Sequence, residues 1–275
     1  MLTLKEIKKN LEAVSVIKNV VLTYQEIANL KMKKIREKAF KNREFFDQLL
    51  EIYKRVKTAF LFFKKNKGQK DYFLSAKKER VVVFLSANHL FYGGLMSEIW
   101  SKIFSFFQVN KADLAIVGRV GQHLVEGFGV KKFFFFELDD DQPEEKNVEK
   151  IVSFIKQYKE IIVFYGRYKN VLSQEVVASK ITELEIGKKG ESKQYIFEPS
   201  PEAIVEFFER EIIATLFHQC LLEHQLARYA SRVIAMYQAT EKAKETERKL
   251  IAKMRKLKKQ SATKKQIELF GKISI

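Results

Sequence analysis

Glycine and proline are confined almost entirely to the middle of this chain of 275 residues. Neither residue occurs before Gly68, and neither occurs between Pro201 and Gly271. Glycine and proline mark most turns and interrupt helices, so both ends of the chain can form helices without a break. The pattern predicts two very long helices, one from each end, around a turn-rich middle.

The C-terminal helix is predicted to begin with Ser200 as N-cap, Pro201 at the first helical position and Glu202 at the positive end of the helix dipole. At 1.5 Å per residue, roughly 70 helical residues span on the order of 100 Å, so part of this helix must project from any compact domain. An apolar seam with steps of three and four residues, typical of a coiled coil, continues for five heptads. Its members are Leu226, Tyr229, Val233, Met236, Thr240, Ala243, Glu247, Leu250, Met254, Leu257 and Ser261.

The N-terminal helix has a less regular seam. Apolar or small residues repeat every seven positions, and Ile17 and Tyr24 are taken as the intermediate positions. The repeated residues are Ile7, Val14, Val21, Ala28 and Ile35. The simplest arrangement pairs the two helices with each other as an antiparallel coiled coil. The alternative is that they are two separate helices of a bundle.

The middle of the chain alternates short apolar runs with helical segments. Strands are predicted at residues 80–86, 112–117 and 160–165, helices at 95–107 and 148–158, and an edge strand at 193–197. This alternation is typical of a parallel sheet covered by helices. The predicted fold is therefore α/β: a small Rossmann-like domain at residues 75–195, with coiled-coil helices at 1–67 and 201–270.

The net charge of +17 is located at the two ends. Residues 1–70 carry 18 Lys or Arg against 7 Asp or Glu, and residues 241–265 carry 11 against 3. Such surfaces attract an acidic partner, which leaves nucleic acid, anionic lipid and acidic proteins open. The basic run from Lys253 to Lys265 has no interleaved aromatic residues, which a platform for single-stranded nucleic acid requires.

No apolar stretch reaches the roughly 20 residues of a membrane-spanning helix. The N-terminus alternates apolar residues with Lys and Glu, so it does not read as a secretory signal. The single cysteine, Cys220, excludes an internal disulfide and favours a reducing compartment. From these features we expect a soluble, cytoplasmic protein.

The usual signatures of catalytic and ligand sites are missing. Gly93-Gly94 and the Gly118–Gly121 segment read as tight strand–helix turns, because GxxxxGK[ST] and GxGxxG are both absent. Cys220 lacks an activating neighbour, and the histidines lack metal-ligand spacing. The acidic run Asp139–Glu145 is interpreted as a solvated loop. We therefore expect no catalytic residues, no cofactor and no metal.

Several segments resemble the gamma subunit of the rotary F-type ATP synthase. Tyr195–Glu202 (YIFEPSPE) and Ala230–Thr240 (ASRVIAMYQAT) are similar to family segments, the second to a signature close to AARMVAMxxAT. Shorter similarities follow in chain order. They are Lys31–Lys34 to KMRK, Ala87–Leu95 to DRGLCGGL, Ile116–Arg119 to IGRKG, Ser173-Gln174 to SQ, and Arg255–Thr263 to NKARQASIT.

The chain also departs from the family pattern. Tyr24 stands where the family has the methionine of KITxAM, and Ala87–His89 replaces DRG. Lys258-Lys259 replaces RQ, and the two-cysteine insertion of chloroplast members is absent. The resemblance therefore implies a divergent bacterial member.

The resemblance implies a non-catalytic central-stalk rotor that couples ion-driven rotation to ATP chemistry on a head of three alpha and three beta subunits. The implied location is peripheral, on the cytoplasmic face of the bacterial cell membrane, and no nucleic acid is involved. Implied contacts with alpha and beta are Tyr24, Lys31, Arg232, Met236, Thr240, Lys256, Lys258, Lys259 and Thr263. Implied contacts of a foot with the membrane c-ring and the epsilon subunit are Gly93, Gly94, Glu198 and Pro199.

Two alternatives stay open from the sequence. A basic coiled-coil protein associated with nucleic acid would use its arms to clamp phosphates, and its binding would weaken steeply with salt. An enzyme built on the α/β domain would need a ligand pocket near Gly93-Gly94.

Overall fold

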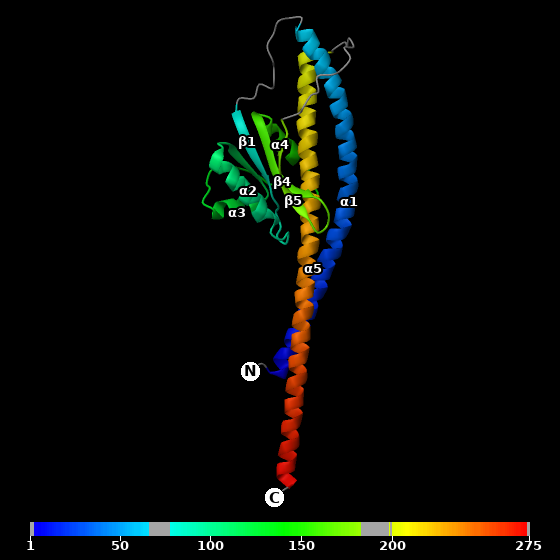
Figure 1. Ribbon diagram of the computed structural model, residues 1–275, viewed down its shortest axis with the longest axis vertical. Helices are drawn as coiled ribbons and strands as arrows, with labels where there is room; N and C mark the ends of the chain where they lie inside the picture. Colours follow the sequence, from blue (N-terminus) through cyan, green and yellow to red (C-terminus); the bar gives the residue numbers. More distant parts are fainter. Residues whose placement is uncertain (1–2, 66–77, 183–197, 199, 274–275) are drawn as a thin grey trace. The chain divides into compact units, whose positions relative to one another are not determined.

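The computed structural model describes residues 3–65, 78–182, 198 and 200–273. The chain forms two compact units: a two-helix unit of residues 1–30 and 232–275, and an α/β unit of residues 31–231. Helix α1 (Leu4–Lys65) and helix α5 (Pro201–Ile273) each contribute to both units (Figure 1). These units cut both helices and do not follow the predicted domain boundaries, which stay a prediction. In the part of the chain described, no helix is long and apolar enough to cross a membrane.

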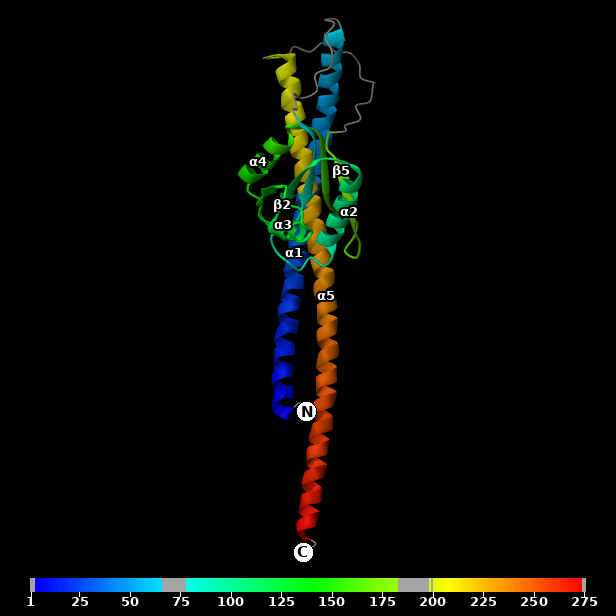
Figure 2. The same cartoon turned by 90° about the vertical axis from the view of Figure 1, so that its left-hand side faces the viewer.

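The two-helix unit is an antiparallel pair. Its α1 segment and its α5 segment lie side by side and run in opposite directions in both views (Figures 1 and 2). Lys18 Nζ lies 2.9 Å from Glu247 Oε2, which joins the two segments. The seam predicted for α5 is confirmed from Leu226 to Leu257, because every member is buried or half-buried. The predicted pairing of the two long helices is therefore confirmed.

The seam of α1 follows a different phase from the predicted one. Ile17 and Tyr24, taken as intermediate seam positions, are 56% and 45% exposed. Leu11, Lys18 and Gln25 are half-buried in their place. The steps from Ile7 are therefore four and then three, which is the reverse of the expected order. The sequence favoured Ile17 and Tyr24 as intermediate seam positions because they are more apolar than Lys18 and Gln25. The correct positions, Lys18 and Gln25, are polar and therefore carry no apolar signal.

The α/β unit contains a sheet with the strand order β3-β2-β1-β4-β5. The strands are β1 (Lys78–Leu85), β2 (Asp113–Val117), β3 (Phe134–Phe136), β4 (Tyr158–Tyr168) and β5 (Gln174–Lys180). Strands β1 to β4 are parallel, and β5 is antiparallel to β4. The prediction of a Rossmann-like α/β domain is confirmed.

Helices cover both faces of this sheet. The residues of β1 alternate between two cores, as expected for a strand buried on both sides. Val81 and Val83 pack with α4 (Glu145–Ile155) and α5. Val82 and Phe84 pack with α2 (Leu95–Val109) and lie beside α3 (Arg119–Gly127). Helix α5 thus serves as a covering helix of the sheet as well as a partner of α1.

Helices α1 and α5 also pair within the α/β unit. Leu49, Tyr53 and Ile212 form a small buried cluster, and Tyr53 donates a hydrogen bond of 3.1 Å to Glu209. Asn42 donates to Gln219 at 2.8 Å. Residues later in α1 therefore meet residues earlier in α5, so the two helices are antiparallel here as well. Ser200 accepts a hydrogen bond from the Ala203 N–H, which confirms the predicted N-cap of α5.

Three elements are absent from the sequence-based prediction: β3, β5 and α3. The predicted strands at 80–86, 112–117 and 160–165 correspond to β1, β2 and β4. The helix predicted to end at Tyr158 ends at Ile155 instead, and Tyr158 opens β4. The predicted edge strand at 193–197 lies outside the described residues.

Candidate functional site

The carboxyl ends of β1 and β4 mark the point where the sheet reverses its strand order. The chain proceeds from β1 to β2 and β3 on one side, then returns to place β4 on the other side of β1. In open α/β sheets, ligands bind in the crevice at such a switch point. In this chain α5 crosses the crevice, and its side chains occupy it.

His224 of α5 bridges the two strand ends. Its Nδ1 accepts a hydrogen bond of 3.1 Å from the Gly166 N–H of β4, so its Nε2 carries the proton and donates at 3.1 Å to the Ser86 carbonyl after β1. Complete burial, together with the nearby charge of Arg228, lowers the pKa of His224 to about 3. The imidazole is therefore neutral at physiological pH, with both nitrogen atoms engaged.

Arg228, one turn later on α5, forms a buried ion pair with Asp140. Arg228 Nη1 lies 2.5 Å from Asp140 Oδ1, and the two side chains are 5% and 4% exposed. Arg228 also donates to the carbonyl oxygens of Asp140 and Ser86 at 3.0 and 3.3 Å. Its guanidinium lies 5.4 Å from the centre of the Tyr92 ring. Several hydrogen bonds accompany this pair, as a buried charge requires.

Asp140 takes the place of a bound anion in the turn after β1. Its carboxylate accepts hydrogen bonds from the Asn88 N–H at 2.9 Å and from the His89 N–H at 3.0 Å. Backbone N–H groups between a strand and the following helix bind phosphate in nucleotide-binding folds. A phosphate would have to displace Asp140 here. The interpretation of residues 139–145 as a solvated loop is therefore wrong at Asp140, because a distant arginine and this turn bury it.

The opposing charge holds Asp140 ionised. Burial on its own raises the pKa of a carboxyl group, but Arg228 and the Asn88 N–H outweigh burial and hold the pKa of Asp140 below its ordinary value.

The glycine turns at the strand ends pack against protein. Gly118 has a φ of +104°, and a Cβ there would lie 2.8 Å from the backbone of Ala87. Gly93 has a φ of +58°, and a Cβ there would lie 3.0 Å from the Ser231 hydroxyl of α5. Both turns are tight strand–helix connections, as predicted.

The adjacent residue Asp141 joins the loop after β3 to both long helices. Its carboxylate accepts hydrogen bonds from Lys31 Nζ of α1 and from the Tyr229 hydroxyl of α5. The Lys31 ammonium also lies 5.6 Å from the centre of the Tyr229 ring. Lys31, predicted as a partner contact, thus has an internal partner.

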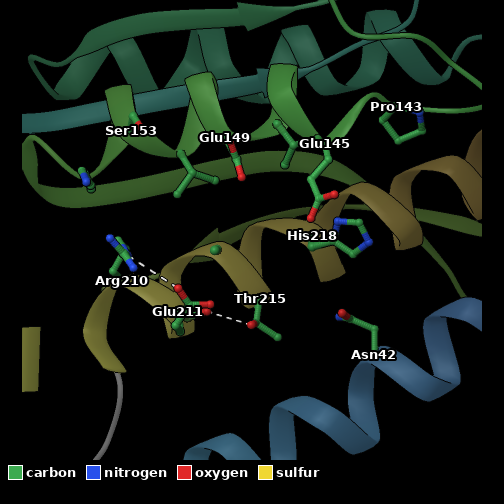
Figure 3. A pocket seen from close by; sticks show the side chains of 13 residues that line it. Asn42, Pro143, Glu145, Glu149, Ser153, Arg210, Glu211, Thr215 and His218 are labelled. Atoms are coloured by element: carbon green, nitrogen blue, oxygen red, sulfur yellow. Dashed lines mark hydrogen bonds and ion pairs between the residues drawn. The ribbon is translucent and has the colours of Figure 1, made fainter. Parts of the chain in front are cut away.

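A separate cleft of about 690 Å³ lies between α4 and α5, with Asn42 of α1 at its edge (Figure 3). Charges of both signs line it: Glu145 and Glu149 come from α4, and Arg210 lies 3.5 Å from Glu211 on α5. The Thr215 hydroxyl donates a hydrogen bond of 2.7 Å to the Glu211 carbonyl.

Over residues 3–65, 78–182 and 200–273, no group of three or more His, Cys, Asp or Glu is placed to hold a metal ion.

Cys220 is buried in the core beneath the sheet. Burial raises the pKa of its thiol to about 12, so the thiolate that would react is disfavoured.

The predicted contacts with alpha and beta fall into two structural groups. Arg232, Met236 and Thr240 are buried, the last two as members of the α5 seam. Tyr24 of α1 is exposed, and so are four residues on the last part of α5: Lys256, Lys258, Lys259 and Thr263. Partner contact by any of these residues stays a prediction.

The predicted foot residues are only partly described. Gly94 is the N-cap of α2, and Gly93 faces α5. Glu198 is exposed, and Pro199 lies outside the described residues. Their contact with a ring or an epsilon subunit stays a prediction.

The buried set of Ser86, Asp140, His224 and Arg228 was absent from the sequence prediction. Its members are separated by up to 142 residues. One signal was available: His224 and Arg228 are four residues apart, so they share a face of the predicted helix.

The comparisons with known proteins agree with this architecture. A family model described as ATP synthase matches residues 3–272. An ATP synthase gamma chain of Actinobacillus pleuropneumoniae is 23% identical over 258 residues, covering 87% of each chain. One of Cytophaga hutchinsonii is 21% identical over 293 residues, covering 98% of each.

Solved structures share the fold. A chain in the central stalk and c-ring structure of Tetrahymena thermophila mitochondrial ATP synthase matches with a TM-score of 0.59 at 17% identity, covering 80% of this chain and 99% of that one. A chain from the Euglena gracilis mitochondrial ATP synthase in rotational state 3 matches with a TM-score of 0.56 at 14% identity, covering 88% and 93%. Because the family model spans nearly the whole sequence, this chain belongs to the ATP synthase family, and the relatives it matches are gamma chains.

Proposed function

We propose that this chain is the central-stalk rotor of an F-type ATP synthase. It would couple ion-driven rotation to ATP synthesis or hydrolysis on a surrounding head of alpha and beta subunits. The observation that carries the proposal is the family match over residues 3–272. The antiparallel helices of the two-helix unit supply what a rotor requires, which is an elongated, asymmetric element.

The rotor itself would be non-catalytic. Sheets of this topology bind nucleotides in the crevice at the switch point. Here the side chains of His224, Arg228 and Asp140 lie in that crevice: His224 is hydrogen-bonded to the Ser86 carbonyl after β1, and Arg228 is paired with Asp140. ATP chemistry would take place on the beta subunits. The work of this chain would be allosteric: an asymmetric rotor makes different contacts with three equal catalytic sites and so gives each a different nucleotide affinity. By reciprocity, nucleotide turnover would change the rotor's angle.

The lysines exposed on the last part of α5 would meet the head. Lys256, Lys258 and Lys259 are all exposed, so their charges are available to acidic surfaces. Exposed ion pairs are weak, at about 0–1 kcal/mol each, which suits a contact that must form and break in every turn.

A foot of the rotor would dock on the membrane c-ring and the epsilon subunit. Gly93, Gly94, Glu198 and Pro199 are the residues proposed for this docking. The protein would then be peripheral, on the cytoplasmic face of the bacterial cell membrane, and would transmit rotation driven by H⁺ or Na⁺.

Co-expression with the alpha and beta subunits of the same genome tests the proposal. We expect a stable complex with one copy of this chain per three alpha–beta pairs, measured by native mass spectrometry. We also expect the complex's ATPase activity to depend on this chain. A chain that purifies alone while alpha and beta assemble without it would contradict the proposal.

A further inference from the structure

We propose that Asp140 and Asp141 form the linkage that passes torque between the sheet of the α/β unit and the two long helices. This inference rests on the proposed rotor function and assigns a role within it to two residues of the loop after β3. The carboxylate of Asp140 contacts α5, and the carboxylate of Asp141 contacts both α1 and α5.

The attachment to α5 is buried and strongly bonded. Asp140 pairs with Arg228 at 2.5 Å, and the backbone carbonyl of Asp140 accepts further hydrogen bonds from Arg228 and Gln225. Two successive turns of α5 are therefore bound to one residue of the loop.

The attachment to α1 depends on Asp141. Lys31 donates to this carboxylate from α1, and Tyr229 donates to it from α5. In the α/β unit α1 and α5 are antiparallel, so they meet at Asp141 from opposite directions. A twist of this pair about its own axis moves the two helices in opposite senses. A linkage to only one helix would leave the other free to slide, whereas adjacent residues bound to both resist the twist.

The loop itself is fixed to the sheet. The Asn88 side chain, after β1, donates to the Leu138 carbonyl at 2.7 Å. The same side chain accepts a hydrogen bond from the Arg119 N–H, after β2, at 3.0 Å. Asp139 accepts from the N–H groups of Asp141 and Gln142 at 2.8 and 2.7 Å, which holds the turn that presents Asp141. Force on either helix is thereby delivered to the ends of β1 and β2.

Torsional stiffness of the assembled rotor is the readout that separates a linkage from a merely stabilising contact. The complex with alpha and beta is immobilised through beta, and a gold rod is attached to a cysteine introduced at exposed Lys131. Native Cys220 is buried, so labelling is selective. The angular variance of the rod during the dwell between steps is inversely related to stiffness.

Variants at Lys31 and Asp141 are chosen because both side chains are partly exposed, and their loss leaves no buried charge. We expect Lys31→Met and Asp141→Asn each to raise the angular variance at least twofold, and Asp141→Asn to leave unloaded ATP hydrolysis within twofold. The double exchange Lys31→Asp with Asp141→Lys should return the variance towards that of the unchanged chain. Glu137→Gln is the matched control: it removes a negative charge from the same region, but Glu137 pairs with Arg119 and, among the residues described, with neither long helix.

Unchanged variance in both single variants, in complexes that rotate, would overturn the linkage. An equal increase in Glu137→Gln would overturn it as well. Failure of the unchanged chain to assemble or rotate would instead contradict the rotor function, so the two failures are distinguishable.

Discussion

Arg228→Met is expected to lower the free energy of unfolding by about 3–5 kcal/mol, because it leaves the carboxylate of Asp140 buried without its counter-charge. Asp140 is 4% exposed, so water cannot replace the guanidinium. Methionine keeps much of the length and apolar volume of arginine, which restricts the change mainly to the charge. Urea denaturation of the full chain at pH 7, followed by circular dichroism, measures the loss.

Two further variants separate the buried pair from a general effect of removing arginine. Arg119→Met breaks the exposed pair with Glu137, 2.6 Å apart, and should cost less than about 1 kcal/mol. Adding Asp140→Asn to Arg228→Met removes the stranded charge but keeps an oxygen for the N–H groups of the β1 turn, so stability should partly recover. A loss below about 1 kcal/mol in Arg228→Met alone would contradict the structure of this site.

Acidification from pH 7 to pH 4 is expected to destabilise the fold by about 3 kcal/mol through His224 alone. Its pKa falls from an ordinary 6.5 to about 3 in the folded chain, so the unfolded chain binds the proton first. The contribution of His224 is complete above pH 6.5 and is lost progressively as the pH falls towards 3. The lowered pKa of Asp140 acts in the same direction, but only below its ordinary value of 3.8. Urea denaturation at one-unit intervals from pH 7 to pH 4 measures the slope.

His224→Gln tests whether protonation of His224 causes this loss of stability. A glutamine can accept from the Gly166 N–H and donate to the Ser86 carbonyl, yet it does not titrate. One proton bound on unfolding contributes about 1.4 kcal/mol per pH unit to the slope of the unfolding free energy against pH. In His224→Gln that slope should therefore be smaller than in the unchanged chain by up to this amount. His123→Gln, at an exposed histidine on α3, is the control for a histidine-to-glutamine exchange outside the buried site. Equal slopes in His224→Gln and the unchanged chain would refute the role of His224.

The long helices and the central strands could be predicted because their signals are local. The absence of glycine and proline defines α1 and α5 within a few residues, and β1, β2 and β4 are continuous apolar runs because both faces of each are buried. Strand β3 has three residues and the edge strand β5 is only partly buried, so neither carries such a run. The phase of the α1 seam depends on the pairing of Lys18 with Glu247, 229 residues away.

The site at the sheet's switch point depends on contacts that no local pattern encodes. Asp140 lies in an acidic, proline-containing segment that is typical of an exposed loop, and only Arg228, 88 residues later, makes its burial stable. The sequence correctly indicated tight strand–helix turns at Gly93 and Gly118. It did not indicate that an internal carboxylate takes the phosphate's place. The pair of Lys31 with Asp141 joins residues 110 positions apart, so no local pattern indicates it, and partner contact by Lys31 stays a prediction.

Single-molecule rotation is the most direct test of the rotor function. The complex of this chain with its alpha and beta subunits is fixed to a surface, and a gold rod is attached to Lys131→Cys. With ATP, we expect rotation in one direction with three dwell positions per turn, and rotation should stop when ATP is removed. A rod that only fluctuates about one angle while the same complexes hydrolyse ATP would contradict the claim that this chain is the rotor.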